Sequence, residues 1–73
     1  MSRFPQVSGR ECAAALAKAG FIFKRQKGSH MILRRAVPFA QVSVPDHAEL
    51  DRGTLRAILR AAGLRPEEFS RLL

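Results

Sequence analysis

Three short segments in the middle of the chain have the composition of β-strands, and turn signals separate them. The aromatic and β-branched residues 21–23 begin the first strand, because such residues favour strands. Lys27-Gly28 predicts a tight turn, since glycine adopts positive φ without a steric cost, and residues 29–35 form the returning strand. Polar and apolar residues alternate over 41–44, and Pro45 ends this third strand because proline donates no ladder hydrogen bond. The pattern predicts three antiparallel strands.

A helical pattern precedes these strands. Ser8 and Glu11 have the spacing of a capping box, in which each side chain bonds the backbone amide of the other residue, so a helix begins there. Gly20 supplies the left-handed residue that ends this helix. Small and apolar residues recur at helical spacing and predict its buried face. They are Cys12, Ala15, Leu16 and Ala19.

A second helical pattern follows the strands, with Asp51 near its start and Gly63 just past its end. Its apolar members are Leu50, Leu55, Ile58, Leu59 and Ala62. Pro66 then takes a first helical position ahead of Glu67 and Glu68. The residues of this last short helix that we expect to point inward are Phe69, Leu72 and Leu73. The predicted fold is α+β: helix, three-stranded antiparallel sheet, then two helices, with the helices on one sheet face and the other face open.

The length of 73 residues predicts one domain spanning residues 1–73, with too little interior for a deep pocket. An active surface is then a sheet face, an edge or a shallow groove. The connection over residues 36–40 is apolar for a hairpin loop. We expect Phe39 to fold back onto the core, and the alternative is that this loop contacts a partner.

The charge is unevenly distributed along the chain. Thirteen Lys and Arg residues against six Asp and Glu residues give a formal net charge of +7. Acidic residues are absent between Cys12 and Pro45, and the basic residues of this stretch are Lys18, Lys24, Arg25, Lys27, Arg34 and Arg35. A segment with one sign of charge is typical of a surface that faces a polyanion.

The cationic run in the predicted hairpin turns on a glycine and presents His30 at the start of an apolar strand. It places phosphate-binding charges beside the one side chain type that gives and takes a proton near pH 7. We hypothesise that His30 is the general base or general acid of RNA cleavage. The residues expected to bind RNA are Lys24, Arg25, Lys27, Gly28 and Ser29. The glycine lets the backbone approach a phosphate, and the serine contacts phosphate or orients the imidazole.

Metal-free RNA cleavage can use the neighbouring ribose 2′-hydroxyl as nucleophile, so the protein must position the backbone, remove the 2′ proton and stabilise charge on the phosphate. The complementary acid stays open. His47 is one candidate, although a loop histidine close to Asp51 is the favoured interpretation, and a lysine is another. We expect neither a metal nor a cofactor, because His30 and His47 stand apart, Cys12 is the lone cysteine and the carboxylates form no cluster.

The sequence also carries expectations about location. No apolar run approaches the roughly 18 residues of a membrane span, and residues 1–5 lack the apolar core of a secretory signal. We therefore expect a cytoplasmic protein. Cys12 lies in a small-residue helical pattern, which predicts a buried thiol rather than a disulfide.

Several blocks, in order and spacing, resemble the HicA toxins, also called the YcfA-like family, which are small bacterial mRNA interferases. The blocks are Ala19-Gly20-Phe21, Arg25-Gln26-Lys27-Gly28-Ser29-His30, Val42-Ser43-Val44-Pro45-Asp46-His47, Gly53-Thr54-Leu55-Arg56-Ala57-Ile58-Leu59 with Ala61-Ala62-Gly63-Leu64, and Glu67-Glu68-Phe69. One departure is Val37-Pro38-Phe39, where many members carry a polar turn.

The resemblance implies a fold like the double-stranded-RNA-binding domain, ribonuclease activity on messenger RNA, and neutralisation by a HicB-like antitoxin that covers the active surface. It also aligns His30 with the catalytic histidine of the family. The first hypothesis is therefore a metal-independent endoribonuclease toxin. The alternative is a non-catalytic RNA-binding module in which His30 stacks on or hydrogen-bonds RNA.

Overall fold

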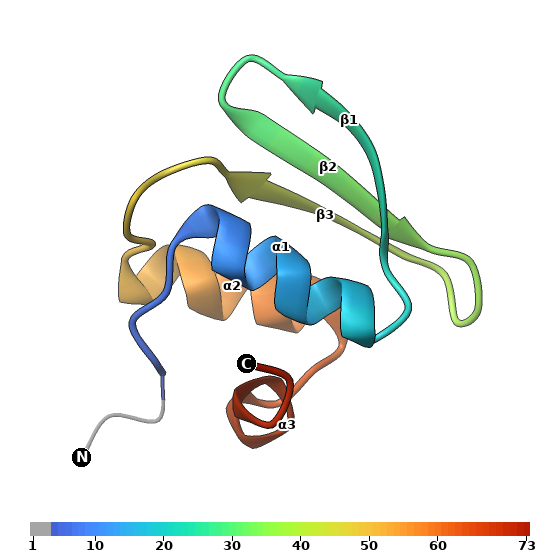
Figure 1. Ribbon diagram of the computed structural model, residues 1–73. Coiled ribbons are helices and arrows are strands. Elements are labelled where there is room, and N and C mark those ends of the chain that lie inside the picture. Colours follow the sequence, from blue (N-terminus) through green and yellow to red (C-terminus); the bar gives the residue numbers. More distant parts are fainter. Residues whose placement is uncertain (1–3) are drawn as a thin grey trace.

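The computed structural model describes residues 4–73. The elements in chain order are α1 (Gly9–Lys18), β1 (Ile22–Lys27), β2 (His30–Arg35), β3 (Ala40–Pro45), α2 (Arg52–Ala62) and α3 (Pro66–Ser70) (Figure 1). This is the α+β order that the sequence predicts. Residues 1–3 lie outside the described residues. They make up most of residues 1–5, where the sequence predicts no secretory signal.

The three strands form one antiparallel sheet in the order β1-β2-β3. Both long helices lie on one face of this sheet, and α3 packs beneath them on the side away from the strands (Figure 1). Helix α2 lies along β3, while α1 contacts β3 and β1. No described element covers the opposite face of the sheet, as the sequence predicts (Figure 1).

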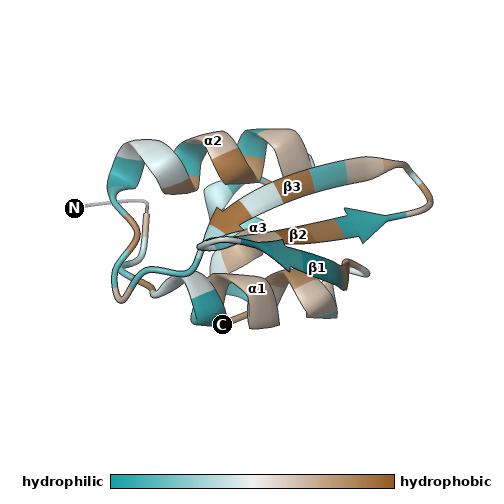
Figure 2. Cartoon of the chain, turned by 90° about the horizontal axis from the view of Figure 1, so that it is seen from above, coloured by the Kyte–Doolittle hydropathy of each residue, from teal (hydrophilic) through white to brown (hydrophobic). Residues whose placement is uncertain are grey.

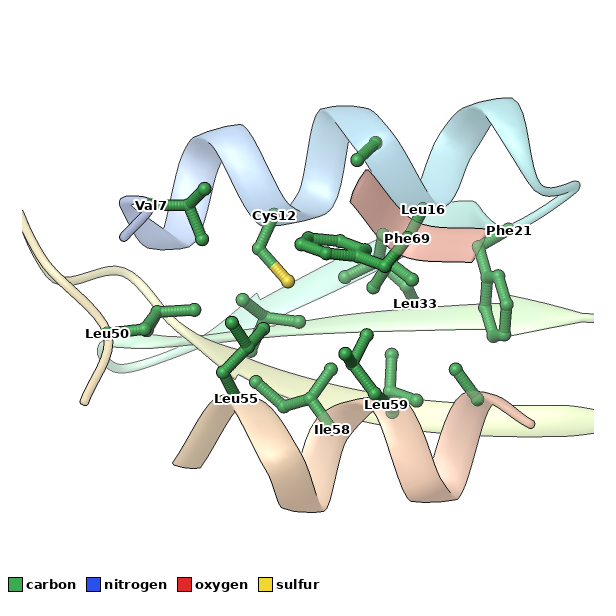
Figure 3. Close-up of a cluster of buried hydrophobic side chains, with 14 of the residues drawn as sticks. Val7, Cys12, Leu16, Phe21, Leu33, Leu50, Leu55, Ile58, Leu59 and Phe69 are labelled. Atoms are coloured by element: carbon green, nitrogen blue, oxygen red, sulfur yellow. The ribbon is translucent and has the colours of Figure 1, made fainter. Parts of the chain in front are cut away.

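The core lies between the sheet and the helices and is built from alternate strand residues. Met31 and Leu33 of β2 and Val42 and Val44 of β3 are buried, because their side chains point toward the helices. The residues between them on both strands face the open side, and Figure 2 shows the resulting alternation of hydropathy along β3. The helices contribute the predicted apolar faces, which meet the strands around Phe69 of α3 (Figure 3).

Side-chain caps fix where the helices begin, as the sequence predicts. The Glu11 amide donates to Ser8 Oγ at 3.0 Å, and the Ser8 amide donates to Glu11 Oε1 at 2.8 Å. Asp51 caps α2 by accepting from the Thr54 amide at 2.8 Å, and Gly63 ends α2 in the left-handed conformation with φ of 75°. Each cap satisfies backbone groups that have no partner within the helix.

Two expectations about the hydrophobic residues are wrong. Phe39 is 70% exposed and does not fold back onto the core. The side chain of Arg35 lies at that end of the core instead. Its Nε donates to the Pro38 carbonyl at 2.9 Å, and its guanidinium stacks on the Phe21 ring at 4.7 Å. Leu73 is 49% exposed, since it follows the last turn and only Leu72 reaches the core.

The turn between β1 and β2 lies one residue later than predicted. Lys27 pairs with His30 as the last rung of the hairpin, so Gly28 and Ser29 form the turn. Ser29 is therefore not a strand residue. Gly28 takes φ of 60°, and placing it at the first turn position allows a two-residue connection with positive φ.

The start of α1 packs so closely on the end of β3 that only glycine fits at position 9. A Cβ there would overlap the Pro45 carbonyl oxygen, and the Gly9 amide donates to the His47 carbonyl at 2.9 Å. We expect Gly9→Ala to lower the free energy of unfolding by about 1–3 kcal/mol through overpacking, measured by urea denaturation. Gly53→Ala is the matched control, because nothing lies within 4 Å of a Cβ there. Equal stability of the two variants would contradict this packing.

Candidate functional site

The β1–β2 hairpin brings the predicted cations to the same sheet face as His30. Lys27 lies directly opposite His30, and Arg25 lies directly opposite Ile32. Residues opposite each other in an antiparallel pair project from the same face. His30, Ile32 and their partners therefore project from the open face of the sheet, away from the helices.

A bulge in β1 produces this arrangement. The register shifts between Phe23 and Arg25, with Phe23 opposite the buried Leu33. In a regular strand, Phe23 and Arg25 would project from one face. The extra residue, Lys24, instead allows the apolar side chain to face the helix side and the arginine to face the open side. Of the predicted RNA-binding residues, Arg25 and Lys27 are thus aligned with His30, while Lys24 lies within the bulge.

The tip of the hairpin is held by Asp46, which follows β3. Its amide donates to the Ser29 carbonyl at 2.7 Å. Its carboxylate accepts from Arg10 Nε at 3.1 Å and from Gln26 Nε2 at 3.4 Å. These bonds join α1, the hairpin and the loop before α2. Nothing lies within 4 Å of a Cβ placed on Gly28, so the backbone at the tip is accessible to a ligand.

The pKa of Asp46 is held below its usual value, mainly because its carboxylate accepts a hydrogen bond from the Arg10 guanidinium. A lowered folded-state pKa stabilises the fold at pH values above the pKa of the unfolded aspartate, and this contribution is lost as pH falls through the folded-state value. We expect Asp46→Asn to lower Tm at pH 7, and the gap to wild type to shrink below about pH 4. Thermal melts of both proteins at several pH values measure this difference in Tm. A gap of constant size down to about pH 2 would contradict this role.

The imidazole of His30 is exposed and is contacted from the neighbouring strand. Its Nδ1 lies 3.3 Å from Ser43 Oγ, and Ser43 projects from the same open face because it lies opposite Ile32. A hydrogen bond at Nδ1 fixes the ring orientation and leaves Nε2 directed at solvent. Ser43 is not among the site residues that the sequence predicts. The alternation of polar and apolar residues over 41–44 could have indicated that Ser43 faces away from the core. The sequence does not reveal the cross-strand register that places Ser43 beside His30.

A groove runs between this histidine and helix α2. Its volume is about 440 Å³. The sheet side includes His30, Ser43 and Gln41, and the helix side includes Thr54 and Ala57. The small residues on the helix leave the imidazole open to a ligand lying along the groove.

The second histidine occupies a different place. His47 is not among the described residues that line the groove, and its carbonyl accepts from the Gly9 amide at the start of α1. Its side chain is exposed and lies close enough to Asp46 and Asp51 for its charge to lower the pKa of both carboxyls, as a smaller contribution than their hydrogen bonds.

The two arginines at the end of β2 differ in role. Arg34 projects from the open face and donates to Gln41 Oε1 at 3.0 Å. Arg35 is a structural residue. Its Nη2 donates to the Ala62 carbonyl at 3.2 Å, which places a cation at the C-terminus of α2, where the helix dipole favours it.

Other kinds of site receive no support within residues 4–73. No group of three or more His, Cys, Asp and Glu side chains there could hold a metal ion. No helix in that part of the chain has both the length and the apolar character to cross a membrane. The Cys12 thiol is buried, and this burial raises its pKa to about 12, so it is an inert core residue.

The comparisons with known proteins identify the family. The family model described as HicA toxin of bacterial toxin-antitoxin matches residues 9–64. This match spans α1 through α2 and includes every residue of the hairpin and of the groove beside His30. A comparison with curated proteins gave no match. Since the family model covers more than half of the chain, the chain belongs to the HicA toxin family of toxin-antitoxin systems.

Proposed function

We propose that this member of the HicA toxin family is a metal-independent endoribonuclease that cleaves messenger RNA in the cytoplasm. The activity resides in a single domain, with His30 as the catalytic residue. The observation that carries the proposal is the exposed imidazole of His30 on the open sheet face, between the groove beside α2 and the cations of β1. A histidine that merely ended a strand would need neither the groove nor the aligned charges.

These positions support the following chemistry. Nε2 of neutral His30 removes the proton of a ribose 2′-hydroxyl, and the 2′-oxygen attacks the adjacent phosphorus. The bond from phosphorus to the 5′-oxygen breaks, the products carry a 2′,3′-cyclic phosphate and a 5′-hydroxyl, and the leaving oxygen takes up one proton. Arg25 and Lys27 neutralise the charge that develops on the phosphate. No redox partner or metal is required.

The proton for the leaving oxygen needs a second group. Lys27 is better placed for this role than His47, because Lys27 lies directly opposite His30 in the hairpin, whereas His47 lies in the loop between β3 and α2. The ammonium of Lys27 carries a proton that can pass to the leaving oxygen while the imidazole acts as the base. Gly28 and Ser29 then bind the RNA backbone at the hairpin tip, and Lys24 binds it at the bulge.

Ser43 is a positioning residue in this proposal, because it acts through His30. We expect Ser43→Ala to lower kcat about 2- to 10-fold, the equivalent of one hydrogen bond, with KM unchanged. Ser43→Thr keeps the hydroxyl and should restore the rate. Steady-state cleavage of a fluorescent RNA measures both constants. A Ser43→Ala variant with normal kcat, or a raised KM alone, would argue against this role.

The proposed partner is a HicB-like antitoxin that neutralises the toxin by covering the open face. The cationic strand β1 is exposed along its whole length, so an acidic partner laid over it excludes RNA by competing for the same charges. This inhibition needs no conformational change in the toxin.

The experiment that separates the enzyme from the non-catalytic RNA-binding module is incubation of the pure protein with a long RNA in EDTA. Cleavage in chelator by wild type, and its loss in His30→Ala, supports the enzyme. RNA binding without cleavage by wild type would favour the binding module.

A further inference from the structure

A line of arginines lies along α2, on a flank that the proposed active site does not use. We call it the arginine ridge, and its members are Arg52, Arg56, Arg60 and Arg65. The first three are spaced at i, i+4 and i+8 and therefore lie on one side of the helix, about 6 Å apart along its axis. Together they line a groove of about 560 Å³ whose apolar members are Phe4, Leu59, Leu64 and Pro66.

The two grooves run along opposite flanks of the same helix. Thr54 and Ala57 face the groove beside His30, and the arginine ridge lines the other. The two grooves adjoin across small exposed residues of α2: Gly53 lines the groove of the arginine ridge and Ala57 lines the His30 groove, and space is open above Gly53. Since a helix with its side chains is about 10 Å across, a chain leaving the His30 groove can pass over Gly53 and Ala57 and reach the arginine ridge.

Arg56 and Arg60 bring exposed positive charge to this second groove. No acidic side chain is among the described residues that line it, although Glu68 pairs with Arg65 at one end at 3.6 Å. Like charges held close together repel, and a polyanion relieves that repulsion. The planar guanidinium also suits phosphate, because it binds two oxygens at once.

We propose that the arginine ridge is a second RNA-binding surface that holds the phosphates of the same strand whose scissile link lies at His30. The identity of the ligand rests on the proposed function. RNA fits this surface better than an acidic protein does, because it carries one phosphate charge per nucleotide and the arginines are regularly spaced along the helix axis. The arginine ridge also adjoins the His30 groove.

The test measures binding of single-stranded RNA to the His30→Ala chain by fluorescence anisotropy at several salt concentrations. Two oligonucleotides are compared, of about 4 and about 20 nucleotides, because the short one fills the His30 groove without reaching the ridge. The ridge variant is Arg56→Glu/Arg60→Glu. The matched control is Lys18→Glu/Arg71→Glu, which changes the net charge equally at exposed positions away from both grooves.

For the long RNA, we expect the ridge variant to lose about tenfold or more in affinity and to reduce the slope of log affinity against log salt by about 1.4, from two lost phosphate contacts. The short RNA should bind the ridge variant and the control equally. Arg56→Gln/Arg60→Gln should show the same pattern, and it excludes a folding defect caused by the introduced carboxylates.

Equal affinity and equal salt slope for the ridge variant and the control on long RNA would overturn the proposal. The proposal would also be overturned if the ridge variant kept its RNA affinity but lost the ability to bind an oligoglutamate peptide. That result would assign the arginine ridge to an acidic protein. The result is independent of catalysis. If wild type fails to cleave RNA, the proposed function fails, while the binding data still decide whether the arginine ridge holds RNA.

Discussion

His30→Ala should fold as wild type does and cleave RNA about 10² to 10⁴ times more slowly, which is the usual contribution of a positioned acid or base. The imidazole is exposed and hydrogen-bonds to Ser43, which is also exposed, so its removal leaves the core intact. Single-turnover cleavage of a defined RNA, with circular dichroism to verify folding, measures this effect.

The matched control for this prediction is His47→Ala. His47 is also exposed and lies just after the same sheet, but it is not among the described residues that line the groove with His30. We expect its cleavage rate to stay within about threefold of wild type, since a surface residue away from the groove supplies no proton. An equal loss of cleavage rate in His30→Ala and His47→Ala would show that both histidines act in catalysis. A full rate in His30→Ala would remove the catalytic assignment.

Phe69→Ala should cause the largest loss of stability, about 3–5 kcal/mol, because removing a buried aromatic ring loses its transfer free energy and leaves a cavity. The ring is fully buried and lies between the helices and the sheet, beside Leu16 and Leu33 (Figure 3). Helix α3 has only five residues, too few for a stable isolated helix, so Phe69 is its main attachment. Urea denaturation measures the change.

A loss of this size is a large part of the roughly 4–11 kcal/mol expected for a domain of this length. Leu73→Ala is the control, because Leu73 also belongs to the C-terminal segment but is half exposed, and we expect a change within about 0.5 kcal/mol. Phe69 does not line the His30 groove. The folded fraction of Phe69→Ala should therefore cleave at the normal rate. Similar stability of the two variants would show that α3 is not anchored by this ring.

Much of the fold could be predicted because its determinants are local. The capping box of Ser8 and Glu11 and the left-handed Gly63 act within one turn of the chain, and both occur as predicted. The apolar faces of the helices follow from spacing alone. Phe39 was mispredicted because its apolar character argued for burial, whereas Arg35, a charged residue, covers that end of the core.

The candidate site was predictable in its residue types and not in its geometry. The chain showed that cations and a histidine share a hairpin. It did not show that a bulge at Lys24 would align Arg25 and Lys27 with His30, because bulges depend on how two strands pair. The contact between Ser43 and His30 likewise depends on the register of β2 and β3. The Asp46 bonds to Arg10 and to the hairpin join segments far apart in sequence.

The most direct measurement is end-group analysis of an RNA cleaved by the wild-type protein in EDTA, beside the same RNA carrying one 2′-deoxy nucleotide at the cleavage position. If His30 activates the 2′-hydroxyl, the products carry 2′,3′-cyclic phosphate and 5′-hydroxyl ends, and the deoxy substrate is not cut at that position. Cleavage that stops in EDTA, or that continues at the deoxy position, would contradict metal-free cleavage by this histidine.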